Sequence, residues 1–473
     1  MISFRTATRF GAGVPKATQA ASVPRAPAVA TLCRAVHRSR ATAPKCRAYT
    51  SSSAPSRSPA LAFKREPEPV PVIQANEAYK APELPRVTAG ERDIFIHWEG
   101  AEWSRFHNLW LRDHCRCAEC FHPVTKQRLF STFDIPPDIE PASARPTPEG
   151  LEVVWQPASM PHTSLYPWSW LHYNTYDPPR PPEESEKVLW GAKIQQDPPT
   201  VAYEEAMADD GYGLYKWLSK IDRFGFCFVS GVPPTPEATE ELTLRMGFIR
   251  ETHYGKFWDF TADLARGDTA YTNLALPAHT DSTYFSDPCG IQLFHLLSHT
   301  NGTGGATLLV DGFYVASILK DLHPDTYEFL STASVPAHAA GEEGVLYRAS
   351  APVLAHDARI GVLRRVRWNN DDRSVVRSIE ARDVPRLYEA MRTWNKLLTS
   401  PDSEYWVQLT PGTVIAIDNH RVLHGRSAFN GTRRMCGAYV GADEFRSRLA
   451  VLGERFAPKV EGGEGRTAWS VEF

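Results

Sequence analysis

A histidine and an aspartate lie two residues apart in the segment 268–287, as His279 and Asp281. On an extended strand, residues at this spacing point to the same face, so both side chains can reach one metal ion. A distant histidine would complete a 2-His-1-carboxylate triad, and His424 in DNHRVLHGRSAF is the best candidate. Such a triad leaves open positions suited to Fe(II) and oxygen chemistry. An isolated His-x-Asp pattern is also compatible with a structural histidine, so the metal site needs support from other residues in the sequence.

A second group of possible ligands is the C-x-C-x2-C cluster of Cys115, Cys117 and Cys120. In a reducing compartment, closely spaced thiols favour a metal site over a disulfide. Structural zinc is four-coordinate and tetrahedral, so a fourth ligand is needed. The nearby candidates are the histidines His107, His114, His122, His162 and His172. The alternative is three ordinary buried thiols.

Length and composition predict a globular protein with a large core. The chain has 473 residues, of which 42% are hydrophobic, which is enough for two domains after a leader. It contains no run of eighteen apolar residues, so we expect no membrane span. The net charge of −3 gives no reason to expect nucleic acid or a membrane surface as a partner.

The first 65 residues have the composition of a mitochondrial transit peptide. They contain no Asp or Glu, but many Lys, Arg, Ala, Ser and Thr. Arg47 lies three residues before Thr50, as at a matrix-protease cleavage site, which predicts a mature chain in the mitochondrial matrix. A disordered basic tail is the alternative. Residues 66–88 are rich in proline and read as an extended lead-in.

The elements that would position these ligands form two predicted domains. Residues 90–176 contain short strands and turns, which indicate a small β-rich domain that carries the cysteines. The proline-rich stretch from Asp177 to Lys187 marks the boundary. Within 200–455, helices are predicted over 203–218, 235–246 with Thr235 as its cap, 311–319 and 384–399, and strands elsewhere. We therefore expect a mainly β fold with some α, a double-stranded β-helix or jelly roll that holds the ligands inside its barrel.

Residues 90–455 resemble the carnitine-pathway 2-oxoglutarate dioxygenases in several long segments. The resemblance rests on the segments WLRDHCRCAEC, DTAYTNLALPAHTDSTYF, PCGIQLFH, GTGGATLLVDGFY and DNHRVLHGRSAFNGTRRMCGAYV. It implies Fe(II) at His279, Asp281 and His424. It also implies zinc at Cys115, Cys117 and Cys120, with His162 of PHTSLYPWSWL as the fourth ligand.

The cosubstrate 2-oxoglutarate would chelate the iron through its keto-acid end, so its far carboxylate needs a fixed cation, and an arginine fork suits it. Arg433 lies nine residues after His424, on the next predicted strand. Its neighbour Arg434 is an alternative, but strand alternation puts the two on opposite faces, and the family pattern favours Arg433. Arg426 can reach the chelating end, and the family places the hydroxyl of Thr307 on 2-oxoglutarate.

The closest likeness is to the branch that hydroxylates N6-trimethyllysine at C3, the first step of carnitine biosynthesis. A trimethylammonium group has no N–H, so aromatic faces are the available means of recognition, through cation–π attraction. The residues at the family's cage positions are Tyr254, Trp258, Tyr271 and Tyr439. Asp268 for the ammonium and Asn369, with Asn370 as an alternative, are implied at the amino-acid end of the substrate.

The reaction implied by the resemblance uses Fe(II), 2-oxoglutarate and O2, with ascorbate keeping the iron reduced, in a homodimer. Two other functions stay open. γ-Butyrobetaine dioxygenase shares the triad, cage and zinc domain, but it lacks a leader and has a longer insertion between its distal histidine and its arginine. The second alternative function is a catalytically silent module that binds trimethyllysine. The intact triad argues against it. The chain departs from the family pattern at His420, where Trp is usual, and at Asn273, where Lys is expected.

Overall fold

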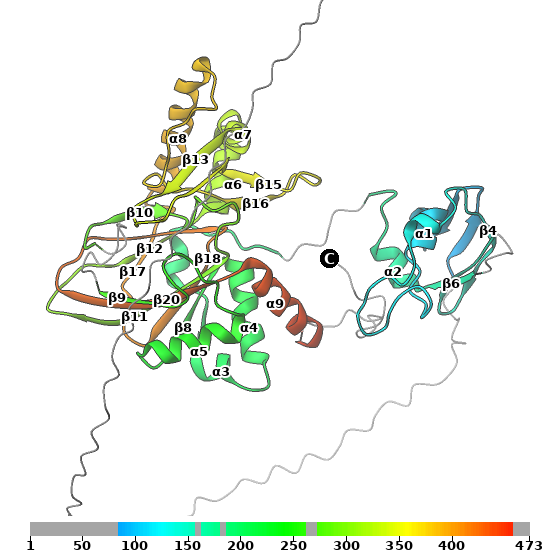
Figure 1. The fold of residues 1–473 in the computed structure, drawn as a ribbon, viewed down its shortest axis with the longest axis horizontal. Coiled ribbons are helices and arrows are strands. Elements are labelled where there is room, and N and C mark those ends of the chain that lie inside the picture. Colours follow the sequence, from blue (N-terminus) through cyan, green and yellow to red (C-terminus); the bar gives the residue numbers. More distant parts are fainter. Residues whose placement is uncertain (1–83, 157–161, 180–185, 262–271, 457–473) are drawn as a thin grey trace, which may run out of the picture. The chain divides into compact units, whose positions relative to one another are not determined.

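The computed structural model describes residues 84–156, 162–179, 186–261 and 272–456. The predicted transit peptide and the candidate residues Asp268 and Tyr271 lie outside these ranges. Over the described residues the fold is mainly β with additional helices, as predicted (Figure 1). None of the helices in these ranges is long and apolar enough to cross a membrane.

The N-terminal elements form two three-stranded antiparallel sheets, ordered β1-β2-β3 and β4-β5-β6. Alternate residues such as Ile94 and Ile96 on β2, or Leu151 and Val153 on β5, enter a shared core. The strand β3 ends at His107, whose side chain caps the following helix by accepting a hydrogen bond from Leu109 N. The elements are β1 (Arg86–Ala89), β2 (Asp93–His97), β3 (Trp103–His107), α1 (Asn108–Asp113), β4 (Pro141–Thr147), β5 (Gly150–Trp155), β6 (His162–Tyr166) and α2 (Trp168–Tyr173).

The C-terminal elements are organised around two larger sheets, one of six strands in the order β7-β8-β18-β11-β20-β9 and one of four in the order β10-β19-β12-β17. Two hairpin pairs, β13-β14 and β15-β16, are added. The strands are β7 (Thr200–Ala202), β8 (Phe226–Ser230), β9 (Trp258–Thr261), β10 (Leu276–His279), β11 (Ile291–Thr300), β12 (Thr307–Asp311), β13 (Ser334–Ala339), β14 (Tyr347–Pro352), β15 (Leu354–His356), β16 (Leu363–Val366), β17 (Tyr405–Val407), β18 (Thr413–Asp418), β19 (Val422–Arg426) and β20 (Thr432–Val440). The helices are α3 (Tyr203–Met207), α4 (Tyr212–Phe224), α5 (Pro236–Met246), α6 (Gly312–Leu322), α7 (Pro324–Thr332), α8 (Val384–Leu398) and α9 (Ala442–Phe456).

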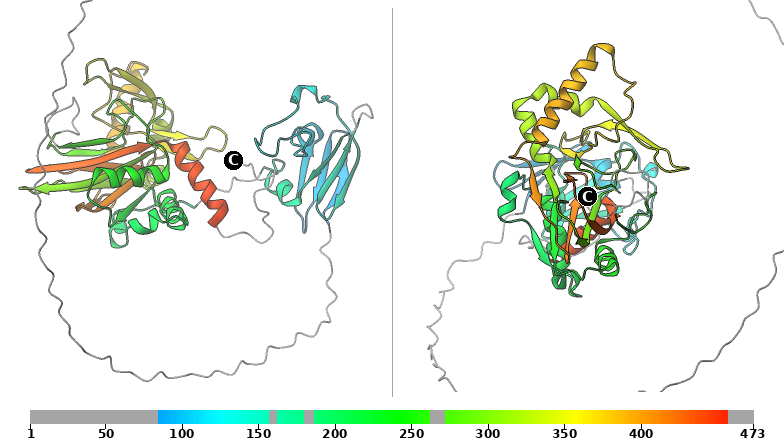
Figure 2. Two further views of the ribbon diagram at one scale, coloured as in Figure 1. Left: turned by 60° about the horizontal axis from the view of Figure 1, so that its bottom comes forward. Right: turned by 90° about the vertical axis from the view of Figure 1, so that its left-hand side faces the viewer.

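Both sheets are buried on their two faces, which explains why their strands are almost continuously apolar. On β18, Val414 and Ala416 pack under α4, α5 and α9, whereas Ile415 and Ile417 point into the space between the sheets. On β12, Leu308 and Val310 instead pack against α6, α7 and α8. Figure 1 shows α3, α4 and α5 on one side of the strands and α7 and α8 on the other, and the turned views in Figure 2 keep this order.

Of two helices predicted from local sequence patterns, the structure confirms one and divides the other into two. The helix predicted at 235–246 is confirmed, because Thr235 Oγ1 accepts a hydrogen bond of 3.2 Å from Ala238 N. The single helix predicted over 203–218 is wrong, since the chain turns between α3 and α4. Gly211 has a φ of 78° at that turn, and a Cβ on Gly213 would overlap the carbonyl group of Glu205.

A buried ion pair fixes the turn between β18 and β19. Arg421 donates to Asp311 Oδ1 at 3.0 Å and Oδ2 at 2.7 Å, and both residues are almost fully buried. Two further guanidinium N–H groups donate to the carbonyl oxygens of Arg223 and Val188. Asp311 also accepts hydrogen bonds from backbone N–H groups and caps α6. The pair therefore joins four distant segments three residues before His424.

Replacing Arg421 with methionine should strongly destabilise the fold. The substitution leaves the Asp311 carboxylate buried without its cation, and breaking such a pair costs about 3–5 kcal/mol. Arg434→Met is the matched control, because Arg434 pairs with Asp259 on the surface and an exposed pair contributes less than about 1 kcal/mol. Equal losses in the free energy of unfolding, measured in urea, would contradict a special role for the buried pair.

Candidate active site and metal centres

The two histidines of the predicted triad meet across paired strands. His279 ends β10 and lies directly opposite His424 on β19. The Nε2 atoms of His279 and His424 lie 3.3 Å and 3.6 Å from Asp281 Oδ1. His279 Nδ1 lies 2.8 Å from the carbonyl oxygen of Pro277, which favours a proton on Nδ1 and a free lone pair on Nε2. The structure thus brings together the three side chains that the sequence grouped.

Asp281 reaches this position by a different route from the predicted one. The strand ends at His279, so strand alternation does not carry the aspartate. Instead the side chain of Asn419 pairs with its backbone, accepting from Asp281 N at 2.7 Å and donating to Asp281 O at 3.1 Å. Ser282 then turns the chain away with a φ of 54°. Asn419 was not predicted, because nothing in the local sequence links two positions so far apart.

The carboxylate of Asp281 has one occupied and one available oxygen. Oδ2 accepts hydrogen bonds from Tyr439 Oη at 2.7 Å and Gln292 Nε2 at 2.5 Å, whereas Oδ1 faces the histidines. Burial raises the pKa of Asp281, but the charges and hydrogen bonds of the histidines outweigh it and hold the pKa well below its usual range. For His279, burial lowers the pKa, and the interactions with Asp281 raise it to about 8.

A pocket between the two sheets opens onto this cluster. Its volume is about 140 Å³. The predicted residues that line it, besides the three candidate ligands, are Tyr254, Trp258, Thr307, Asn369, Arg426, Arg433 and Tyr439. Residues as far apart in sequence as Tyr254 and Tyr439 therefore line one cavity.

Two buried arginines lie at one part of the pocket. Arg433 is 6% exposed and has no acidic partner among the described residues, whereas Arg434 points to the other face and pairs with Asp259. Burial is the main cause that lowers the pKa of Arg433 to about 10, and the charge of Arg426 adds to it. Arg426 donates to the carbonyl oxygens of Thr272 and Leu274. Buried cations of this kind fit an anionic ligand.

Aromatic rings form another part of the wall. Trp258 lies on β9 opposite Gly437 on β20, and a Cβ on that glycine would collide with the indole ring. Tyr254 Oη lies 3.1 Å from Tyr284 Oη. Tyr284, Phe260, Phe294 and Gln292 also line the pocket but were not predicted. Their signal was their closeness in sequence to Asp281 and Trp258, or their place on a buried strand.

The polar residues near Asn369 form a small acidic group. Asn369 Nδ2 donates to Asp372 Oδ2 at 2.8 Å, and Asp371 and Asp372 line the pocket as well. Asn370, the sequence alternative, does not line it. The RWNNDD motif thus supplies two acids that were not predicted, next to the predicted asparagine.

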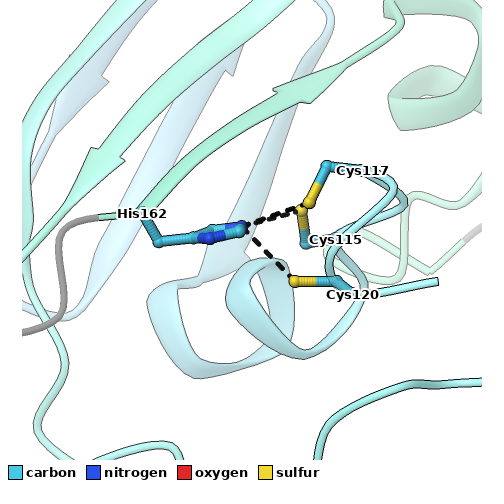
Figure 3. A group of neighbouring side chains, drawn as sticks. All are labelled: Cys115, Cys117, Cys120 and His162. Atoms are coloured by element: carbon cyan, nitrogen blue, oxygen red, sulfur yellow. Dashed lines mark hydrogen bonds between the residues drawn. The ribbon is translucent and has the colours of Figure 1, made fainter.

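The second candidate metal centre lies in the N-terminal half (Figure 3). His162 on β6 points its Nε2 at three sulfur atoms, 3.3 Å from Cys115 Sγ, 3.6 Å from Cys117 Sγ and 3.4 Å from Cys120 Sγ. The hydrogen bond from Cys120 is the main cause that lowers the pKa of the Cys115 thiol to about 4. The arrangement selects His162 from the five candidate histidines by geometry.

The groups around the four side chains suit a bound cation and its thiolates. Arg112 Nη1 donates to Cys120 Sγ at 3.3 Å, and Glu119 lies 3.7 Å from His162 Nδ1. The other histidines have different contacts. His114 Nδ1 lies 2.7 Å from the carbonyl oxygen of Trp110, and His122 accepts backbone hydrogen bonds from its own turn.

Comparison with known proteins places the chain in a family. Residues 183–439 match the model of the "Taurine catabolism dioxygenase TauD, TfdA family", and residues 86–172 match the model "Gamma-butyrobetaine hydroxylase-like, N-terminal". The trimethyllysine dioxygenase of Neurospora crassa is 44% identical, over 82% of this chain and 86% of that one. The chain belongs to the trimethyllysine dioxygenase group of the TauD, TfdA family.

Two other relatives of this trimethyllysine dioxygenase family member have lower sequence identity to it. The human mitochondrial trimethyllysine dioxygenase is 40% identical, over 74% of this chain and 83% of that one. The γ-butyrobetaine dioxygenase of a Pseudomonas species is 33% identical, over 76% of this chain and 93% of that one. The resemblance inferred from sequence motifs is therefore confirmed at the level of the family.

The donor atoms of both centres fit the metals that were predicted from the sequence. Ligand atoms about 2.1 Å from an octahedral ion lie roughly 3.0 Å apart when adjacent, close to the 3.3 Å and 3.6 Å around Asp281 Oδ1. Nitrogen and sulfur bound tetrahedrally to zinc lie roughly 3.5 Å apart, close to the 3.3–3.6 Å around His162. In each set, the lone-pair donor atoms all lie within 4.8 Å of one another.

Proposed function

We propose that the protein is an Fe(II)- and 2-oxoglutarate-dependent dioxygenase that hydroxylates N6-trimethyllysine at C3. The observation that carries this proposal is one pocket that joins the three-ligand cluster, the aromatic wall and the buried Arg433, which has no acidic partner within the described ranges. The names of the relatives at 40–44% identity support the choice of substrate.

In this proposal His279, Asp281 and His424 hold Fe(II), which supplies oxygen activation coupled to decarboxylation of 2-oxoglutarate. Arg433 binds the far carboxylate of 2-oxoglutarate with its planar fork, and Thr307 donates its hydroxyl hydrogen to the same group. Arg426 lies nearer the chelating end. The buried walls exclude water from the reacting atoms, and the protein's main contribution is position.

The substrate would lie with its trimethylammonium group against the rings of Tyr254, Trp258 and Tyr439. Each good desolvated cation–π contact contributes about 2 kcal/mol. Tyr271 remains a proposed fourth wall, and Asp268 and Asn369 remain proposed partners of the amino-acid end. Asp372, hydrogen bonded to Asn369, adds a negative charge that favours an ammonium group there.

The proposed architecture is a jelly roll made by the six-stranded and four-stranded sheets, preceded by a zinc-binding β-rich domain. The tetrahedral spacing around His162 supports Cys115, Cys117, Cys120 and His162 as ligands of a structural zinc. The boundaries 1–65, 90–176 and 200–455, a homodimer, and ascorbate as reductant of the iron complete the proposal.

A competition assay tests the proposed reaction. The protein, supplied with Fe(II), 2-oxoglutarate and ascorbate, receives trimethyllysine and γ-butyrobetaine together, and mass spectrometry follows both hydroxylated products. We expect hydroxytrimethyllysine to dominate. Preferred hydroxylation of γ-butyrobetaine would identify the related enzyme instead, and binding without turnover would identify a silent module.

We also propose that the mature protein acts in the mitochondrial matrix. The acid-free leader supports this, and the animal relatives carry the word mitochondrial in their names. N-terminal sequencing of protein purified from mitochondria should find a start near Thr50. A mature protein that retains Met1, or one found only in the cytosol, would refute the leader.

A further inference from the structure

We propose that Tyr439 and Gln292 form a clamp on Asp281 that holds it as a one-oxygen metal ligand and connects the substrate wall to the iron. The proposal rests on the proposed function for the identity of the metal and the substrate. Tyr439 would then have two separate roles, its ring against the substrate and its hydroxyl on the ligand.

The clamp is built into the larger sheet. Gln292 on β11 and Tyr439 on β20 are directly opposite in the strand register, so their side chains leave the same face as neighbours. Both reach the same atom, Asp281 Oδ2, at 2.5 Å and 2.7 Å, and Gln292 Nε2 also lies 3.3 Å from Tyr439 Oη. Two strands of one sheet therefore control a carboxylate that follows a strand of the other.

The direction of each hydrogen bond follows from chemistry. An ionised carboxylate only accepts, so the tyrosine hydroxyl must donate to it, and Gln292 must present its NH2 group. The opposite amide orientation would bring Gln292 Oε1 against a carboxylate oxygen. In the orientation observed, Oε1 has no hydrogen-bond partner among the described residues, although Gln292 is 2% exposed. The protein leaves that acceptor unpaired while the NH2 group contacts the carboxylate.

The consequence for the metal is a fixed coordination mode. With Oδ2 taken by two donors, only Oδ1 is free to bind the ion beside the two histidines. A carboxylate that bound through both oxygens would fill one of the positions that the triad leaves open for 2-oxoglutarate and oxygen. Partners of this kind orient a ligand, and their loss typically costs about 10–100-fold in metal affinity or activity.

The substitution Tyr439→Phe separates the two roles, because it removes the hydroxyl and keeps the ring. We expect the dissociation constant for Fe(II), measured anaerobically by calorimetry on zinc-loaded protein, to rise about 10–100-fold. The dissociation constant for trimethyllysine, measured with Fe(II) saturating, should change less than about threefold, because the cation–π face remains. More 2-oxoglutarate should be consumed per hydroxylated product.

Tyr254→Phe is the matched control, since it also removes a hydroxyl from the pocket wall. That hydroxyl lies beside Tyr284 Oη and not on Asp281, so the Fe(II) dissociation constant should stay within about twofold. Gln292→Met removes the second donor at similar volume and should weaken Fe(II) binding without lowering the melting temperature, because it also removes a buried unpaired oxygen.

The metal-binding measurement needs no substrate, so it can fail independently of the proposed reaction. If Tyr439→Phe and Gln292→Met both bind Fe(II) as tightly as the unaltered protein, the clamp is refuted. The same conclusion follows if Tyr439→Phe weakens trimethyllysine binding as much as Tyr439→Ala, with Fe(II) affinity unchanged. Failure of the unaltered protein to hydroxylate trimethyllysine would instead refute the substrate.

Discussion

Arg433→Ala should weaken 2-oxoglutarate binding by roughly 30-fold to several thousand-fold and leave trimethyllysine binding nearly unchanged. Arg433 is buried and has no acidic partner among the described residues, so its loss leaves the ligand's far carboxylate in a buried pocket without its arginine fork. Truncating one partner of a buried charge pair costs about 2–5 kcal/mol, and each 1.4 kcal/mol is about tenfold in affinity. Calorimetry with each ligand, under anaerobic conditions, measures both effects.

The converse result is expected for Trp258→Ala. Removing this ring should weaken trimethyllysine binding and affect 2-oxoglutarate little, because the indole belongs to the aromatic part of the pocket. Arg434→Ala is the control for Arg433→Ala, because Arg434 lies on the same strand, β20, but its side chain pairs with Asp259 on the other face. If Trp258→Ala and Arg433→Ala weakened both ligands equally, the substitutions would be acting through folding, and the two subsites would have to be abandoned.

Cys117→Ser should lower bound zinc and folded yield together. Structural zinc contributes about 10–16 kcal/mol of apparent binding free energy, which is folding free energy when the site does not exist in the unfolded chain. In the unaltered protein, metal analysis should give one zinc per chain, and X-ray absorption should give sulfur distances of about 2.3 Å.

Cys227→Ala provides the control for the zinc prediction. This thiol is buried in β8, outside the cysteine cluster, so its loss should leave the zinc content of the purified protein unchanged. Zinc content that stays the same in Cys117→Ser would refute the assignment of the four ligands.

Residue chemistry and spacing were enough to propose His279 and Asp281 with His424, and to group the three cysteines, whereas the choice of His162 came from the resemblance to a known family. Each set contains rare residue types at short spacing or in recognisable segments. One set is His279, Asp281 and His424, and the other is the three cysteines with His162. The structure brings each set together. The explanation for Asp281 was nevertheless wrong, because β10 ends before it. Its backbone is held by Asn419, a contact across 138 residues that no local pattern encodes.

Other features could not be predicted because they depend on tertiary contacts. The apolar spacing over 203–218 continues across the turn between α3 and α4, and the helix is divided by the positive φ of Gly211 and the close approach at Gly213. The roles of Gln292 and Tyr284 depend on which strands become neighbours. Helices α7 and α9 were missed as well, although α7 begins with Pro324, a residue that commonly starts helices.

The position of β19 determines when the candidate iron site can form. This strand lies between β10 and β12, and β10 pairs with no other strand among those that the structure describes. His279 and His424 are 145 positions apart in sequence (424 minus 279), so the strand that carries the first ligand waits for one that is synthesised much later. Closing so long a loop is slow compared with local folding. A nascent chain therefore cannot assemble the triad before residue 426 has emerged, and iron can bind all three ligands only after that point.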